Sequence, residues 1–116
     1  MQYILMAYVN EAGWPKMTQA EQQQGMAAYM AYNEALTKAG VVKGSNRLQP
    51  TSAATTVRVE NGKSQVLDGP YADSKEQLGG YFLIDVPDLD AAISWAARCP
   101  ASAHGVVEVR PIWEMR

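Results

Sequence analysis

The 116-residue sequence predicts a ferredoxin-like α+β sandwich with the element order βαββαβ and an extra hairpin. Three observations support this fold class: an apolar N-terminal strand, two segments whose apolar residues recur at helical spacing, and an Asn-Gly turn between two segments that are predicted to be strands. In a split βαβ order the strands form an antiparallel sheet that carries both helices on one face. A chain of this length predicts one domain, residues 1–116, that buries about two-thirds of the surface its unfolded chain exposes.

The first half of the chain predicts a strand followed by a long helix. Residues 2–9 have apolar side chains at both alternating positions, as expected of a strand that is covered on both sheet faces. Thr18 and Glu21 have the spacing of a capping box, and Gly40 suits the left-handed cap that ends a helix. Residues 47–50 give only weak evidence for a second strand.

The second half predicts a hairpin, a strand, a helix and a final strand. Asn61-Gly62 is the dipeptide favoured in a two-residue hairpin turn. A helix is predicted to begin at Pro87-Asp88, because apolar residues then recur at helical spacing as far as Cys99-Pro100. The predicted strands of this half cover residues 55–60, 63–67, 81–86 and 106–112.

The apolar character of residues 2–9 and 81–86 on both strand faces predicts self-association. Helices cover only one face of the predicted sheet, so a monomer would expose a hydrophobic sheet face. In a soluble protein a large exposed apolar face usually marks an interface. We therefore expect a homodimer in which the uncovered sheet faces pack against each other.

Composition and charge argue against several classes of partner. The net charge is −2 and the ten basic residues are scattered, whereas nucleic-acid binding needs Lys and Arg concentrated on one face. The single cysteine cannot form an intrachain disulfide, and no Cys/His pattern suggests zinc. The N-terminus lacks the basic start of a secretory signal, and no apolar run reaches the roughly 18 residues of a membrane span. We expect a cytoplasmic protein with no metal, no cofactor, and no nucleic-acid or membrane partner.

The segment DGPYADSKEQLGGY, residues 68–81, is rich in acids and glycines and is either a catalytic loop or a turn. Asp68 is its best chemical candidate, because an acid at a strand end is placed to move a proton in a cleft. The alternative role of Asp68 is an acceptor that holds the turn. Asp73 and Glu76 have the spacing of a helix N-cap and its third residue, which favours a one-turn helix over an acid–base pair. Gly79-Gly80 would end this helix.

Arg58, Glu108 and Arg110 form a second constellation, drawn from strands that are otherwise apolar. Glu108 and Arg110 share one strand face, and Arg58 could join them in a buried, salt-bridged network. One alternative is a structural ion cluster at the dimer interface, since buried charges need compensation. The other is a ligand site in which a planar guanidinium binds a carboxylate or phosphate.

His104 is the only histidine, and an imidazole with an unperturbed pKa of about 6.5 is the readiest proton carrier. It lies in ASAHGV, a predicted loop before the last strand, where the alternative is an exposed side chain without a catalytic role. Cys99 lacks the electropositive surroundings that activate a thiol and is predicted to pack in the core.

The first helix carries Tyr29, Tyr32 and Asn33, which place polar groups on an otherwise apolar face. This stripe is either core or the lining of a ligand cleft between helix and sheet. Trp14, with Pro15 in the loop after the first strand, is placed to cover that cleft.

These candidates together predict one ligand cleft near the strand that follows residues 68–80, which should be central in the sheet. The glycines allow close backbone approach, which suits both a tight turn and a pocket wall. The predicted lining of this cleft is Tyr29, Asn33, Asp68, Tyr81 and one of Arg58 or Arg110.

Several motifs resemble the YCII-related family, in the branch named for its DGPF motif. The matching segments are EALTKAG, TTVRV, LDGPYADSKEQLGGYFLIDV and EVRP. Tyr71 replaces the phenylalanine of the motif, and Tyr29 stands where better-known members have a histidine of the suggested active site. A phenol with a reference pKa of about 10 is a poor general base, so that mechanism does not transfer. The resemblance implies a dimeric α/β barrel, an unidentified small-molecule ligand and an indirect link to an extracytoplasmic-function sigma factor.

Three functions fit these features. The first is a small-molecule-binding or regulatory homodimer. The second is a small enzyme, a lyase, isomerase or hydrolase, in which Asp68 or His104 moves a proton on an acidic metabolite held by an arginine. The third is a cofactor-independent monooxygenase, which rests on analogy of fold alone. The missing histidine in the first helix favours binding over catalysis.

Overall fold

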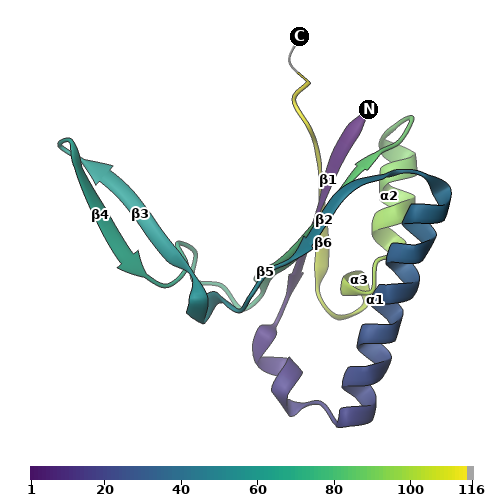
Figure 1. The fold of residues 1–116 in the computed structure, drawn as a ribbon, viewed down its shortest axis with the longest axis horizontal. Helices are drawn as coiled ribbons and strands as arrows, with labels where there is room; N and C mark the ends of the chain where they lie inside the picture. The colour runs from purple at the N-terminus through teal and green to yellow at the C-terminus, as the bar shows by residue number, and fades with distance from the viewer. Residues whose placement is uncertain (115–116) are drawn as a thin grey trace.

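The computed structural model describes residues 1–114, whose largest sheet has four antiparallel strands with the helices on one face (Figure 1). Both central strands of this sheet pair on each side with antiparallel neighbours. The predicted ferredoxin-like class is confirmed, and the strand that was expected to follow residues 68–80 is central as predicted. In spatial order the strands are β2 (Val42–Arg47), β5 (Gln77–Asp85), β1 (Gln2–Val9) and β6 (Val106–Pro111).

Three helices pack on this sheet: α1 (Gln19–Ala39), α2 (Leu89–Arg98) and the one-turn α3 (Ala101–His104). The predicted capping box is present, because Glu21 N donates to Thr18 Oγ1 at 3.1 Å and Thr18 N donates to Glu21 Oε1 at 2.9 Å. Gly40 ends α1 in the left-handed region with φ of 71°. The Asp88 side chain caps α2 by accepting from Ala91 N at 2.9 Å.

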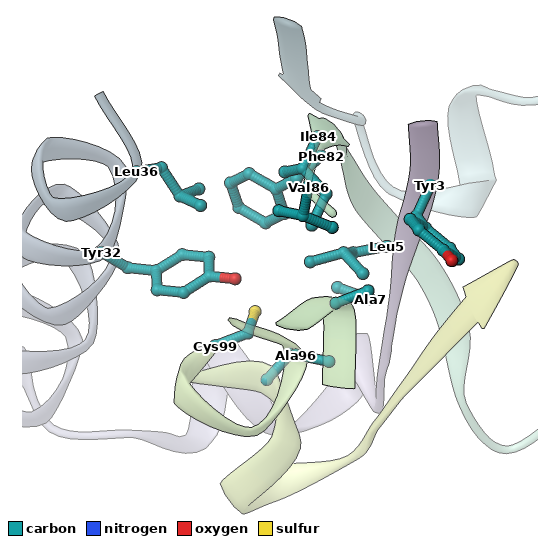
Figure 2. Close-up of a cluster of buried hydrophobic side chains, with 12 residues drawn as sticks. Tyr3, Leu5, Ala7, Tyr32, Leu36, Phe82, Ile84, Val86, Ala96 and Cys99 are labelled. Carbon is teal, nitrogen blue, oxygen red and sulfur yellow. The ribbon is translucent and has the colours of Figure 1, made fainter. Parts of the chain in front are cut away.

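The core lies between the helices and one sheet face. Figure 2 shows Tyr32 and Leu36 pointing from α1 toward the strands. The Tyr32 ring meets Phe82 edge-on with centroids 5.1 Å apart, and its hydroxyl donates to Trp95 O at 2.7 Å. Leu36 is fully buried, so packing fixes α1 to the sheet, while the hydrogen bond from Tyr32 joins α1 to α2. The other buried residues are Tyr3, Leu5, Ala7, Phe82, Ile84, Val86, Ala92, Ala96, Cys99 and Ala101.

The opposite sheet face carries none of the helices formed by residues 1–114 (Figure 1). Its central residues are paired across β1 and β5, Ile4 with Leu83 and Met6 with Tyr81, and these four side chains are only half-buried. Residues of opposite parity on the same strands are the buried ones, because successive side chains alternate between faces. This second face is called the uncovered face below.

The predicted hairpin forms a separate two-stranded sheet of β3 (Thr55–Glu60) and β4 (Lys63–Asp68). Its turn residues Asn61 and Gly62 have φ of 52° and 75°, as a two-residue primed turn requires. The hairpin projects from the body on the side of the sheet away from the helices (Figure 1).

The segment between the hairpin and β5 differs from its prediction. Residues 69–76 form bends and no helix, so the expected one-turn helix beginning at Asp73 is wrong. Gly79 and Gly80 lie inside β5, which begins at Gln77 and not at residue 81. A Cβ on Gly80 would lie 2.9 Å from the Asn46 carbonyl oxygen, so the glycine serves a close strand contact rather than a helix end.

Two further boundaries also differ from the sequence-based expectation. The second strand covers Val42–Arg47 rather than residues 47–50, because it pairs with β5 from Ile84 to Gly80. His104 was predicted in a loop and instead ends α3, which begins after Pro100. Proline suits the start of a helix, where its missing N–H has no intrahelical partner.

Candidate functional site

Trp14 lies against α1, where its backbone accepts a hydrogen bond and its ring packs beside Gly25. It lies in the 3₁₀ helix η1 (Glu11–Lys16), and its carbonyl oxygen accepts from Gln22 Nε2 at 2.9 Å. A Cβ on Gly25 would lie 3.5 Å from Trp14 Cζ3, so the helix approaches the indole edge closely at this point. The predicted covering residue is therefore fixed beside the helix and not left on a free loop.

Glu11 anchors the same segment to two other parts of the chain. Its carboxylate accepts from the backbone N–H of Thr51 at 3.1 Å and from the Thr51 hydroxyl. Its own backbone N–H donates to Gln77 Oε1 at 3.0 Å, at the start of β5. These bonds join η1, the short helix η2 (Thr51–Ala53) and the central strand β5 at one corner of the molecule.

Arg47, the last residue of β2, places its guanidinium over the Trp14 ring, with Cζ 5.6 Å from the ring centroid. This distance suits a cation–π interaction. Within residues 1–114, the ion pairs present join other groups, and Arg47 takes part in none of them. Its guanidinium therefore remains available to an anion.

Tyr29 lies on α1 on the same side of the sheet and is half-buried against the core. Burial raises the pKa of its phenol, the nearby Cys99 adds to this effect, and the Arg47 charge opposes it. The phenol is therefore neutral at physiological pH and can donate a hydrogen bond, but it is a poor base. Trp14, Tyr29 and Arg47 are called the arginine site below.

The predicted cleft is not assembled within one chain. Tyr29 faces the helix side, whereas Tyr81 lies on the uncovered face, where its hydroxyl accepts from Asn46 Nδ2 at 2.8 Å. Asn33 is exposed on the outer surface of α1. Asp68 is exposed at the end of the hairpin, and its carboxylate accepts no hydrogen bond within the described residues.

The predicted ionic network is reduced to one exposed pair. Arg110 Nη2 lies 3.3 Å from Glu108 Oε2, and the Arg110 side chain is 70% exposed. Arg58 lies on the hairpin instead, with Cζ 5.8 Å from the Tyr71 ring centroid. An exposed pair of this kind contributes at most about 1 kcal/mol, so Glu108 and Arg110 do not form the buried network that was expected.

His104 lies at the rim of a shallow groove of about 510 Å³ between α1 and α3. Arg98 reaches the same groove, with Cζ 4.3 Å from the Trp95 ring centroid. No side chain of residues 1–114 hydrogen-bonds to the His104 imidazole, so nothing described orients it for proton transfer. The groove is lined by Ala28, Ala31, Tyr32, Ala35, Arg98, Pro100, Ala103 and His104.

The predicted packing role of Cys99 is confirmed. Its side chain is 1% exposed, and burial raises the pKa of the thiol. Among residues 1–114 there is no group of three or more His, Cys, Asp or Glu side chains placed to hold a metal ion. Within the same range, no helix combines the length and the apolarity that crossing a bilayer requires.

Sequence reasoning missed Arg47, the charged member of the arginine site. Its role depends on the register that pairs Arg47 with Gly80 and on the fold of η1, and neither can be read from local sequence. The available signal was weak: a tryptophan in a short loop, and an arginine at the end of a strand with a glycine pair opposite.

The fold and the site together define a ferredoxin-like α+β protein with an aromatic–arginine site at one end of its helix layer. The chain belongs to the YCII-related domain family, whose model matches residues 1–116. It is 36% identical over 115 residues to an uncharacterised protein of Rhizobium meliloti, covering 97% of this chain and 92% of that protein.

A solved structure with the same fold is 5-chloro-2-hydroxyhydroquinone dehydrochlorinase from Burkholderia phenoliruptrix, in complex with 2,5-dihydroxybenzoquinone. The TM-score is 0.56 at 15% identity, and the match covers 98% of this chain and 94% of the dehydrochlorinase. This likeness supports the fold.

Proposed function

We propose that this protein is a homodimer that binds a small planar anion at the arginine site. The observation that carries the proposal is the Arg47 guanidinium, which lies over the Trp14 ring and takes part in no ion pair within residues 1–114. A planar guanidinium matches the two oxygens of a carboxylate or the adjacent oxygens of an ionised hydroxyquinone.

The other two side chains suit the same ligand. The Trp14 indole offers an aromatic edge or face beside the bound anion, and aromatic contacts favour planar rings. The neutral Tyr29 phenol can donate a hydrogen bond to a ligand oxygen, since burial raises its pKa. One cation, one aromatic surface and one neutral donor therefore specify a flat, negatively charged ligand.

The ligand class is narrowed by analogy of fold. The dehydrochlorinase with the same fold was solved with 2,5-dihydroxybenzoquinone, a planar molecule whose hydroxyl groups ionise readily. Hydroxyquinones and hydroxybenzoates are therefore the first compounds to test. At 15% identity the neighbour's reaction is not transferred with them.

We propose that the protein binds its small-molecule ligand and does not convert it chemically. An acid–base role for Asp68 or His104 requires a carboxylate or imidazole oriented toward the ligand. Within residues 1–114 neither side chain has a hydrogen-bonding partner, and the ring contact of Arg47 is with Trp14. The small-enzyme alternative stays a prediction from Asp68 and His104, the monooxygenase rests on analogy of fold, and the link to a sigma factor stays an implication of family resemblance.

The homodimer is supported by the uncovered face. Ile4, Met6, Tyr81 and Leu83 form a contiguous apolar centre there, and no element of residues 1–114 covers them. Sedimentation at micromolar concentration should give twice the chain mass, whereas a stable monomer would contradict this part of the proposal.

Calorimetric titration with a hydroxyquinone and with a hydroxybenzoate tests the ligand. Arg47→Ala should weaken binding at least tenfold, because a hydrogen bond to a charged group contributes about 1.5–3 kcal/mol. Arg98→Ala is the matched control, because Arg98 also stacks on a tryptophan but lines the other groove. Equal losses in both variants, or a loss only in the control, would contradict the assignment of the site.

A further inference from the structure

The hairpin, residues 55–68, has two unlike faces. Residues paired across an antiparallel ladder share a face, and the register pairs Val57 with Val66 and Val59 with Ser64. Val57, Val59 and Val66 therefore lie together, with exposed fractions of 60%, 64% and 62%. These three residues are called the valine face. The opposite face carries Arg58, Glu60, Lys63, Gln65 and also Leu67.

The hydrogen bonds at the base of this hairpin join its own two ends and not the main sheet. Gly69 N donates to Ala54 O at 2.8 Å, and the Thr56 hydroxyl donates to Gly69 O at 2.8 Å. Every residue of β3 and β4 except Thr56 is exposed. An isolated two-stranded hairpin is marginally stable in water, so this one needs a second surface against its apolar side.

The accessible surface of the chain indicates how much area a partner could bury. The solvent-accessible surface is 8472 Å², whereas a compact monomer of 12.7 kDa exposes about 6,200 Å². The excess of about 2,200 Å² per chain is about 4,400 Å² for two chains, which is in the range of total area that obligate homodimers bury. The radius of gyration is 16.2 Å, against about 13 Å for a compact chain of this length.

The position of the hairpin indicates which surface it meets. It projects on the side of the sheet opposite the helices, which is the side of the uncovered face (Figure 1). A second copy of the chain packed on the uncovered face would therefore lie beside the hairpin. Two-fold symmetry would give each hairpin the same contact, so one arrangement covers both apolar surfaces of both chains.

We infer that residues 55–68 are a dimerisation arm whose valine face packs on a second copy of this chain. The inference rests on the homodimer proposed above and adds a contact that the sheet faces alone do not make. Asp68 shares the parity of Val66 and Val57, so the arm carries this carboxylate to the partner as well. The sequence-predicted Asp68 then belongs to the dimer contact, whereas Arg58 lies on the opposite face of the arm. Neither residue belongs to the arginine site of its own chain.

Two neighbouring substitutions separate the two faces of the arm. Val66→Glu places a carboxylate on the valine face, and Gln65→Glu places the same carboxylate on the opposite face of the same strand. Sedimentation equilibrium should show the dimer dissociation constant raised at least tenfold by Val66→Glu and less than threefold by Gln65→Glu. Equal constants for Val66→Glu and the unmodified protein would overturn the inference.

Amide hydrogen exchange on the unmodified protein gives an independent test that no folding defect can confuse. At concentrations where the protein is a dimer, the amides of β3 and β4 should exchange at least tenfold more slowly than in the diluted, monomeric protein. A dimer whose hairpin amides exchange at the monomer rate would refute the arm and leave the sheet-to-sheet dimer standing. A protein that is monomeric at every concentration would refute both the arm and the sheet-to-sheet dimer. Such a result would leave the proposed ligand site at Arg47 standing, because calorimetric titration tests that site separately.

Discussion

The corner held by Glu11 gives a prediction whose size follows from its hydrogen bonds. Its carboxylate accepts from the backbone N–H of Thr51 at 3.1 Å and from the Thr51 hydroxyl, in a partly buried setting. Glu11→Ala removes both bonds and leaves a polar N–H without its partner. Hydrogen bonds to a charged group contribute about 1.5–3 kcal/mol, and partial exposure moves the expected loss in unfolding free energy to about 1–2 kcal/mol.

A double-mutant cycle isolates this contact from general effects of each substitution. Thr51→Val removes only the hydroxyl, so it should cost less than Glu11→Ala, and the double variant should lose less than the sum of the two. The four unfolding free energies of the cycle are measured by urea unfolding. The same curves show whether the dependence of the free energy on urea concentration is unchanged between variants. A coupling free energy near zero would refute the account of the corner. Because Trp14 lies in the segment that Glu11 anchors, Glu11→Ala should also weaken ligand binding.

Three further predictions concern stability. Tyr32→Phe should lower the unfolding free energy by about 1 kcal/mol in urea unfolding, because the bond from its hydroxyl to Trp95 O is lost while the ring stays packed. Asp68→Ala should change the unfolding free energy of the monomer by less than about 0.5 kcal/mol, since its carboxylate accepts no hydrogen bond in the described chain. Thr56→Val should lower the unfolding free energy by about 1 kcal/mol, because the bond from the Thr56 hydroxyl to Gly69 O is lost. The unfolding free energy should fall as pH rises above about 8.5. Burial raises the pKa of the Cys99 thiol, so this thiol ionises at lower pH in the unfolded chain than in the folded one. Cys99→Ala should remove this part of the pH dependence.

The elements that local sequence specified are the ones that the structure confirms. Thr18, Glu21 and Gly40 define both ends of α1, and Asn61-Gly62 defines the hairpin turn. In each case the signal and the structure it specifies lie within a few residues, so no tertiary contact is needed to interpret it.

The errors arose where a distant part of the chain decides the local structure. Gly79-Gly80 is typical of a turn, but these residues lie in a strand because Asn46 and Arg47 approach them from β2. The expected turn-holding role of Asp68 is taken by the Thr56 hydroxyl, which a sequence pattern does not reveal.

The candidate site was predictable only in part for the same reason. Tyr29 and Trp14 were recognised from their positions on the first helix and in the preceding loop, and they do lie on one side of the sheet. Arg47 was missed because its contact with Trp14 depends on strand register. Tyr81 was grouped with Tyr29, but strand parity places it on the uncovered face.

The central claim, a planar anion bound at the arginine site, is tested most directly through the three tryptophans. Trp14 lies under Arg47, Trp95 lies under Arg98, and Trp113 is 87% exposed, so each indole N–H reports on a different place. In a two-dimensional ¹H–¹⁵N spectrum, titration with 2,5-dihydroxybenzoquinone should shift the Trp14 indole signal and leave the other two unchanged. A shift of the Trp95 signal with Trp14 unchanged would contradict the claim and would assign the ligand to the groove between α1 and α3.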